Sequence, residues 1–142
     1  MSKHTVPYFS ITHLPSPAFP NGRIAFRPLL QINLIHAAVT VPCYALVDSG
    51  ADVCSFPESF ARLLRIPLLQ APRESMGGLG GYSVAHHWDV NIEIPGVSSF
   101  PVRAAFTTGL DHVGFGLLGQ AGFFERFVVH FDLRKRVFEL ET

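Results

Sequence analysis

The stretch ALVDSGADVCSF, residues 45–56, sets a carboxylate, Asp48, directly after an apolar run and before Ser-Gly-Ala. Asp-Ser-Gly is common in ordinary turns, because Asp and Ser hydrogen-bond to nearby backbone amides and Gly accepts a positive φ. Here the triplet follows YALV without a polar gap, which places the turn at the end of a buried strand. A carboxylate at such a position costs free energy unless it is hydrogen-bonded or functional. The stretch therefore predicts a functional carboxylate at Asp48.

The sequence on both sides of this stretch is organised mostly as short strands. Apolar residues alternate or run over strand length, they are rich in Val, Ile, Leu, Phe and Tyr, and no helical period fits them better. The pattern predicts strands in residues 23–35, 38–48, 82–96 and 99–109, and a terminal hairpin in residues 127–141 that turns at Leu133 to Lys135.

Two segments carry helical signals. SFPESFARLLRI, residues 55–66, predicts one short helix, with Ser55 as the capping residue and Glu58 at the capping-box position. GLLGQAGFFERF, residues 116–127, is the candidate for a second short helix. Many short strands with one or two short helices predict an all-β domain, closed or sandwiched.

Length and turn signals predict one compact domain with an N-terminal arm. A chain of 142 residues can bury one good core but is too small for two. LPSPAFPNG, residues 14–22, is dense in proline and glycine and predicts a loop. We therefore expect residues 1–22 to form an arm or loop, and the domain proper to cover residues 23–142.

The charge pattern argues against nucleic acid and anionic membranes as partners. Eleven Lys and Arg balance eleven Asp and Glu, and the longest basic tract is the Arg134-Lys135-Arg136 turn. Neither nucleic acid nor a membrane is therefore expected as a partner. The N-terminus lacks the apolar core of a signal peptide, and no apolar run is long enough for a membrane span. The expectation is a soluble cytoplasmic protein.

Cysteine and histidine often carry chemistry, but in this sequence they are weaker candidates for functional residues. Cys43 and Cys54 bracket the Asp48 segment, and in a chain without a secretion signal they indicate buried thiols rather than a disulfide. His86 and His87 are adjacent on a predicted strand, so their side chains point to opposite faces and cannot easily bind one ion. We expect no metal and no cofactor.

Two glycine-containing segments accompany the Asp48 turn. SMGGLGGYSV, residues 75–84, places four glycines between two strand-like stretches and predicts the tip of a long hairpin. VGFGLLGQAGFF, residues 113–124, contains an apolar strand that stops at Gly119. Close backbone approach is one use of such a glycine.

Together and in this order, the three segments resemble the retropepsin family, the single-lobed dimeric aspartic peptidases of retroviruses and their cellular and bacterial relatives. The resemblance covers about residues 23–142. It identifies DSGA at residues 48–51 as the catalytic motif, GGLGG at residues 77–81 as the flap, and LLG at residues 117–119 as the second apolar-apolar-Gly motif. The fold that it implies is an all-β, closed retropepsin-like barrel with one lobe per chain.

This resemblance implies that the protein is a homodimer and that its activity is the hydrolysis of peptide bonds. Hydrolysis by this chemistry needs two carboxylates that share a proton, and a chain of this length has one Asp-Ser-Gly and no room for a second lobe. Water between the Asp48 side chains of two copies would attack the peptide bond, with an optimum below neutral pH. Ser49 and Gly50 would hold the two facing turns in close contact.

The resemblance also implies roles for residues around the catalytic motif. It implies substrate binding by Gly78, Leu79 and Gly80 of the flap and by Asp52, Val53 and Leu117. Arg27, in the RPL of residues 27–29, would form an ion pair across the dimer with Asp52. The family often carries Arg or Asn after the second glycine, whereas this chain has Gln120, so an ion pair there would become a neutral hydrogen bond.

Two other classes stay open at the level of sequence. The first is a catalytically weak or inactive dimeric module of the same fold that binds extended peptides or scaffolds a complex, because fold does not determine activity. The presence of Asp48, Ser49, Gly50 and the flap glycines favours the enzyme over this module. The second is an unrelated small β-barrel.

Overall fold

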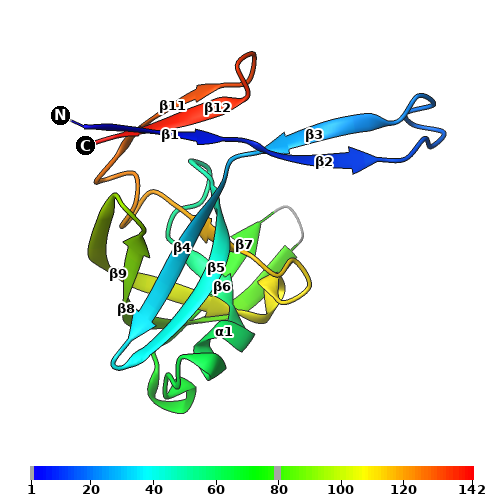
Figure 1. The fold of residues 1–142 in the computed structure, drawn as a ribbon. Helices are drawn as coiled ribbons and strands as arrows, with labels where there is room; N and C mark the ends of the chain where they lie inside the picture. Colours follow the sequence, from blue (N-terminus) through cyan, green and yellow to red (C-terminus); the bar gives the residue numbers. More distant parts are fainter. Residues whose placement is uncertain (1, 79–80) are drawn as a thin grey trace. The chain divides into compact units, whose positions relative to one another are not determined.

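The computed structural model describes residues 2–78 and 81–142, and most of them form strands. Figure 1 shows the strands and one short α-helix. The elements are β1 (Lys3–Pro7), β2 (Phe9–His13), β3 (Arg23–Arg27), β4 (Leu29–His36), β5 (Val39–Val47), β6 (Ser55–Pro57), α1 (Glu58–Leu63), η1 (Leu68–Gln70), β7 (Arg73–Gly78), β8 (Gly81–Ile94), β9 (Ser98–Thr107), η2 (Thr108–Leu110), β10 (Gly116–Leu118), β11 (Val128–Asp132) and β12 (Val137–Glu141). No helix among the described residues is long and apolar enough to cross a membrane.

The described chain divides into two compact units, residues 30–126 and residues 1–29 with 127–142. The predicted boundary between an arm at residues 1–22 and a domain at residues 23–142 is a different division, and it stays a prediction. Residues 1–22 contain the strands β1 and β2 as well as the loop expected from their prolines.

Residues 30–126 are built around one seven-stranded sheet. Its strand order is β4-β5-β10-β6-β9-β8-β7, and an additional pairing joins β4 to β8, so the sheet folds back on itself. Strands β8 and β9 form the longest antiparallel pair, from Ala85↔Thr107 to Ile94↔Ser98. The strands expected in residues 82–96 and 99–109 are therefore confirmed.

The core of this unit is filled by aliphatic and aromatic side chains from the sheet, from the C-terminal end of α1 and from the turn after β10. The largest fully buried side chains in these residues are Phe56, Phe106, Phe123, Ile32, Leu34, Leu64, Ile92 and Leu118. The rings of Phe56 and Phe106 lie 5.9 Å apart between centroids, on the paired strands β6 and β9. Burying such side chains contributes about 1.5–3 kcal/mol each, which fixes the strands that carry the candidate site.

Two helical predictions need correction. The short helix is present as α1, but its N-cap is Pro57 and no side chain caps it, because Ser55 lies in β6 and pairs with Leu117 and Ala105. The second helix expected in residues 116–127 is wrong: β10 occupies the start of that segment and turns occupy residues 122–126. Strand pairing has overridden the capping signal of Ser55 in the first place and the helical signal of residues 116–118 in the second.

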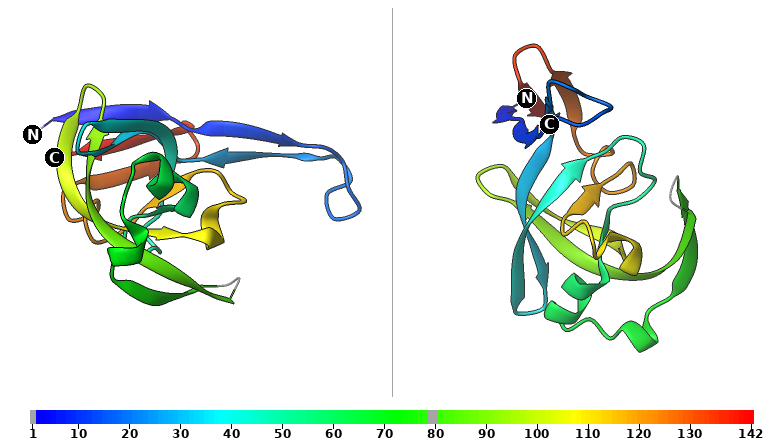
Figure 2. Two further views of the ribbon diagram at one scale, coloured as in Figure 1. Left: turned by 90° about the horizontal axis from the view of Figure 1, so that it is seen from below. Right: turned by 90° about the vertical axis from the view of Figure 1, so that its right-hand side faces the viewer.

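The second unit contains a three-stranded sheet, β1-β12-β11, and a separate two-stranded sheet, β2-β3. Strands β11 and β12 form the predicted terminal hairpin, and the Arg136 N–H donates to the Leu133 carbonyl across its turn. The side chains of His130 and Glu141, which are diagonal neighbours on this hairpin, meet with Nε2 and Oε2 2.7 Å apart. Figure 2 shows β1 continuing into β2, so that β2 and β3 extend beyond the three-stranded sheet.

Candidate active site

Asp48 lies where β5 ends, and hydrogen bonds hold both its backbone and its side chain. The Asp48 N–H donates to the Leu118 carbonyl at 3.0 Å, which continues the pairing of β5 with β10 by one residue. The Gly50 N–H donates to Asp48 Oδ1 at 2.9 Å. The half-buried carboxylate is therefore oriented by the turn that follows it, as the sequence argument requires.

The loop after Asp48 packs directly against the segment after β10. The Gln120 N–H donates to the Ala51 carbonyl at 2.8 Å, and the Ala121 N–H donates to the Asp52 carbonyl at 2.9 Å. A Cβ atom on Gly119 would lie 2.4 Å from the Val53 oxygen and 2.6 Å from the Ala51 oxygen. Only glycine allows this approach, which confirms the use of Gly119 that the sequence suggested.

Gln120 supports the same loop with its side chain. Its Nε2 donates to the Ser49 carbonyl at 2.9 Å. The neutral hydrogen bond expected in place of an ion pair is therefore present at this position. It joins the turn of the DSGA segment to the residue that follows Gly119, so the two motifs form one connected structure.

A cavity of about 680 Å³ opens beside the Asp48 carboxylate. The sequence-predicted residues that line it are Asp48, Gly50, Asp52, Val53 and Leu117. Four further residues come from β7 on the facing hairpin, namely Glu74, Ser75, Met76 and Gly77. The structure thus brings the DSGA loop, β10 and the glycine-rich hairpin together around one space.

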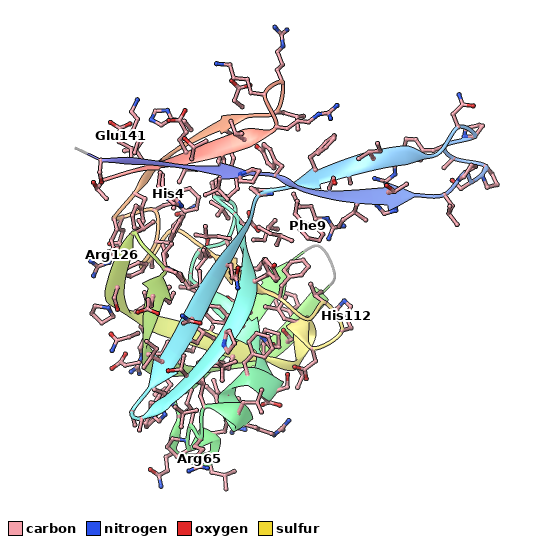
Figure 3. All side chains as sticks on the ribbon, viewed as in Figure 1. His4, Phe9, Arg65, His112, Arg126 and Glu141 are labelled. Atoms are coloured by element: carbon pink, nitrogen blue, oxygen red, sulfur yellow. The ribbon has the colours of Figure 1, made fainter. Side chains whose placement is uncertain are left out.

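A second cavity, of about 460 Å³, adjoins the first. Both are lined by Ser55, Met76, Gly77 and Leu117, so the two cavities are neighbours. The second is also lined by Tyr82, Ser83, Thr107, Leu110 and His112, the last of which Figure 3 labels. Thr107 is almost fully buried and donates from Oγ1 to Ser83 Oγ at 3.0 Å. These two adjoining cavities are together called the groove below, and their volumes suit side chains of an extended ligand.

The glycine-rich segment forms the predicted hairpin. Strands β7 and β8 pair from Arg73↔His86 to Gly78↔Gly81. The two residues expected at its tip, Leu79 and Gly80, lie outside the described residues. Gly77 stands opposite Tyr82, and a Cβ on Gly77 would lie 2.7 Å from the tyrosine ring, so the ring occupies the space that a side chain would fill.

His86 and His87 point in different directions, as expected for neighbours on a strand. His86 Nε2 lies 3.6 Å from Glu58 Oε1 of α1, whereas His87 Nε2 lies 3.4 Å from Glu74 Oε2. His87 also lines the cavity beside Asp48. Sequence reasoning missed His87 and Glu74 as residues of the groove; strand alternation counted back from the flap glycines is the signal that could have found Glu74.

The two cysteines and the possible metal ligands are further groups that could carry chemistry. Cys43 and Cys54 are both free thiols. Cys54 is buried, as the sequence predicted, whereas Cys43 is half-buried. Burial raises the pKa of Cys43 to about 12 and that of Cys54 to about 11, so neither is a ready nucleophile. Among residues 2–78 and 81–142, no group of three or more His, Cys, Asp or Glu is arranged to hold a metal ion.

Comparison with known proteins identifies a similar fold. No protein-family model matches the chain, and no curated protein matches its sequence. Among solved structures, the chain is similar to a retropepsin-like aspartic protease from Rickettsia conorii, with a TM-score of 0.60 and 19% sequence identity. The similarity covers 93% of this chain and 98% of that chain. The chain therefore has the mostly-β fold of a retropepsin-like aspartic protease.

Proposed function

We propose that this protein is an aspartic endopeptidase that works as a homodimer, with one Asp48 from each copy. The observation that carries the proposal is the placement of Asp48: its carboxylate is fixed by the Gly50 N–H at the end of a core strand and faces a groove between β10 and a glycine-rich hairpin. A carboxylate held in this way beside a groove of this size is suited to chemistry on a bound peptide.

The chemistry requires a second carboxylate beside the first. Two carboxylates about 3 Å apart cannot both ionise, so they share one proton, and the pair then contains a base and an acid. The chain has a single Asp-Ser-Gly, so the equivalent group comes from a second copy through a twofold axis. The closed retropepsin-like barrel, one lobe per chain, is part of this proposal.

The proposed reaction is hydrolysis by an activated water. The ionised carboxylate takes a proton from the water as its oxygen attacks the peptide carbonyl carbon, and the protonated carboxylate donates its hydrogen bond to the developing oxyanion. Collapse of the tetrahedral intermediate breaks the C–N bond, and the amine leaves with a proton from the dyad. No covalent intermediate with the enzyme is formed.

The other predicted residues have supporting roles in this proposal. Ser49 and Gly50 would let the two facing turns approach and hold the carboxylates coplanar. The flap residues Gly78, Leu79 and Gly80 would cover the substrate, while Val53 and Leu117 would line apolar subsites on the groove floor. Arg27 would form an ion pair with Asp52 of the second copy.

Cleavage of an unbiased peptide mixture tests the proposal. The wild type is compared with Asp48→Asn at several pH values between about 3.5 and 7, the range in which carboxylate dyads act. Asn keeps an oxygen for the Gly50 N–H, so this variant is expected to fold, and Asp89→Asn removes the same charge from an exposed pair with Arg103. We expect cleavage by the wild type and Asp89→Asn and none by Asp48→Asn.

Two results would contradict this assignment. Cleavage that survives in Asp48→Asn would exclude the carboxylate dyad. A folded wild-type dimer that cleaves no peptide at any pH would favour the alternative, a module that binds extended peptides or scaffolds a complex.

A further inference from the structure

The hairpin formed by β2, β3 and the loop between them, residues 9–27, is called the arm below. Among residues 2–78 and 81–142, β2 and β3 pair only with each other, from Phe9↔Arg27 to His13↔Arg23. Neither outer edge of this two-stranded ribbon pairs with a further strand of the described chain, and an unpaired strand edge is a common place for another chain to bind. A two-stranded ribbon is only marginally stable in water by itself, so the arm gains stability when it is covered.

The arm exposes several large apolar side chains. Leu14 is 82% exposed, Ile24 56% and Phe19 50%. The Arg23 guanidinium lies 4.9 Å from the centre of the Phe19 ring, which gives the loop an ordered tip instead of a loose one. Several large exposed apolar residues on one hairpin are typical of an interaction surface.

The net charges of the two parts of the chain indicate which surface binds the arm. Residues 1–29 contain Lys3, Arg23 and Arg27 and no acidic residue, which gives a net charge of +3. Residues 30–126 contain five arginines and eight Asp and Glu, which gives 5 − 8 = −3. The segment that carries the arm is therefore complementary in charge to the unit that carries the candidate active site.

We propose that the arm of each copy docks on residues 30–126 of a second copy of this chain. The inference rests on the proposed function, because a second copy is the partner that the single Asp48 requires. A twofold axis makes the contact reciprocal, so two arms bind two acidic units. The arm then adds apolar and electrostatic contacts to the dimer and links assembly of the carboxylate dyad to an element outside the groove.

Dimer dissociation constants of full-length variants test the contact. Ile24→Ser and Arg23→Glu, measured by sedimentation equilibrium, are each expected to raise the dissociation constant by about tenfold or more, as loss of an interface contact does. Leu133→Ser is the apolar control, because Leu133 is 60% exposed in the turn after β11 and lies outside both the arm and residues 30–126. Arg134→Glu is the charge control, in the turn after β11. The difference between Arg23→Glu and the wild type is expected to shrink at high salt.

A cross-linking experiment shows which copy the arm touches. A photoreactive phenylalanine analogue replaces Phe19 in a ¹⁵N-labelled chain, which is mixed with unlabelled wild type before irradiation. We expect cross-linked peptides that join labelled residue 19 to unlabelled residues within 30–126. Cross-links confined to peptides of one isotope would overturn the proposal, because the arm would then contact its own chain.

The outcomes separate this inference from the proposed function. A wild type that dimerises and cleaves peptides, with all four variants unchanged in dissociation constant, would overturn the arm contact alone. A dimer that depends on Ile24 and Arg23 but cleaves nothing would support the arm contact and overturn the peptidase. A wild type that is monomeric at every concentration would overturn both.

Discussion

Replacement of Gly119 by alanine provides a strong test of the site geometry. The added Cβ would lie 2.4 Å from the Val53 oxygen and 2.6 Å from the Ala51 oxygen, whereas real Cβ atoms keep at least 3.0 Å from such neighbours. Both neighbours are backbone atoms, so no side chain can swing away to make room. The loop after Asp48 must move by at least 0.6 Å relative to Gly119, since 3.0 − 2.4 = 0.6.

The expected cost follows from what that movement disturbs. Overpacking of a tight contact costs about 1–3 kcal/mol. The shift also strains the hydrogen bonds from the Gln120 and Ala121 amides to the Ala51 and Asp52 carbonyls, and each such bond contributes about 0.5–1.5 kcal/mol. We therefore expect Gly119→Ala to lower the free energy of unfolding by about 2–6 kcal/mol, a large part of the ~5–15 kcal/mol of a typical domain.

Urea unfolding and amide hydrogen exchange measure these effects. Gly114→Ala is the matched control: its Cβ would meet nothing within 4 Å, and its φ of +79° makes alanine cost only about 1–2 kcal/mol. Faster exchange at Gln120 and Ala121 is expected in Gly119→Ala and not in the control. If Gly119→Ala is no less stable than Gly114→Ala and both amides stay protected, the close approach described here is wrong.

Three further predictions concern other groups. Cys43 and Cys54, whose pKa values burial raises, should react slowly with iodoacetamide in the native protein at neutral pH and rapidly in urea, as followed by mass spectrometry. The hydrogen bond from His130 lowers the pKa of Glu141. This carboxylate therefore stabilises the fold at pH values above its ordinary pKa, and the contribution disappears as the pH falls through the lowered pKa. In Glu141→Gln the melting temperature should fall less on acidification than in the wild type. Gln120→Leu removes a side-chain hydrogen bond and should cost about 0.5–1.5 kcal/mol in urea unfolding; an unchanged midpoint would contradict that role.

The sequence predicts best those features that depend on local pattern. The apolar runs that form β4, β5, β8 and β9 were found because a strand buried on one or both faces needs that composition wherever it lies in the fold. The position of Asp48 at a strand end and the close approach at Gly119 were predicted for a related reason. A carboxylate after a buried strand and a glycine after an apolar one are unusual enough to stand out within a few residues.

The features that sequence reasoning missed depend on contacts distant in the chain. Ser55 has the chemistry of a helix cap, but its pairing with β9 and β10 places it in a strand. Glu74 and His87 line the groove because of the register between β7 and β8, and a one-residue change of register would turn their side chains to the other face. One sequence does not fix that register.

The parallel pairing of β5 with β10 has a consequence for the order of events during synthesis. Asp48 and the Leu118 carbonyl that binds its N–H are separated by 118 − 48 = 70 residues, so this contact closes a long loop and forms only after residue 118 has been synthesised. A nascent chain that has emerged only as far as β9 contains the DSGA segment but not the strand that positions it. A chain with the proposed activity would therefore be unable to cleave other proteins until β10 had been synthesised.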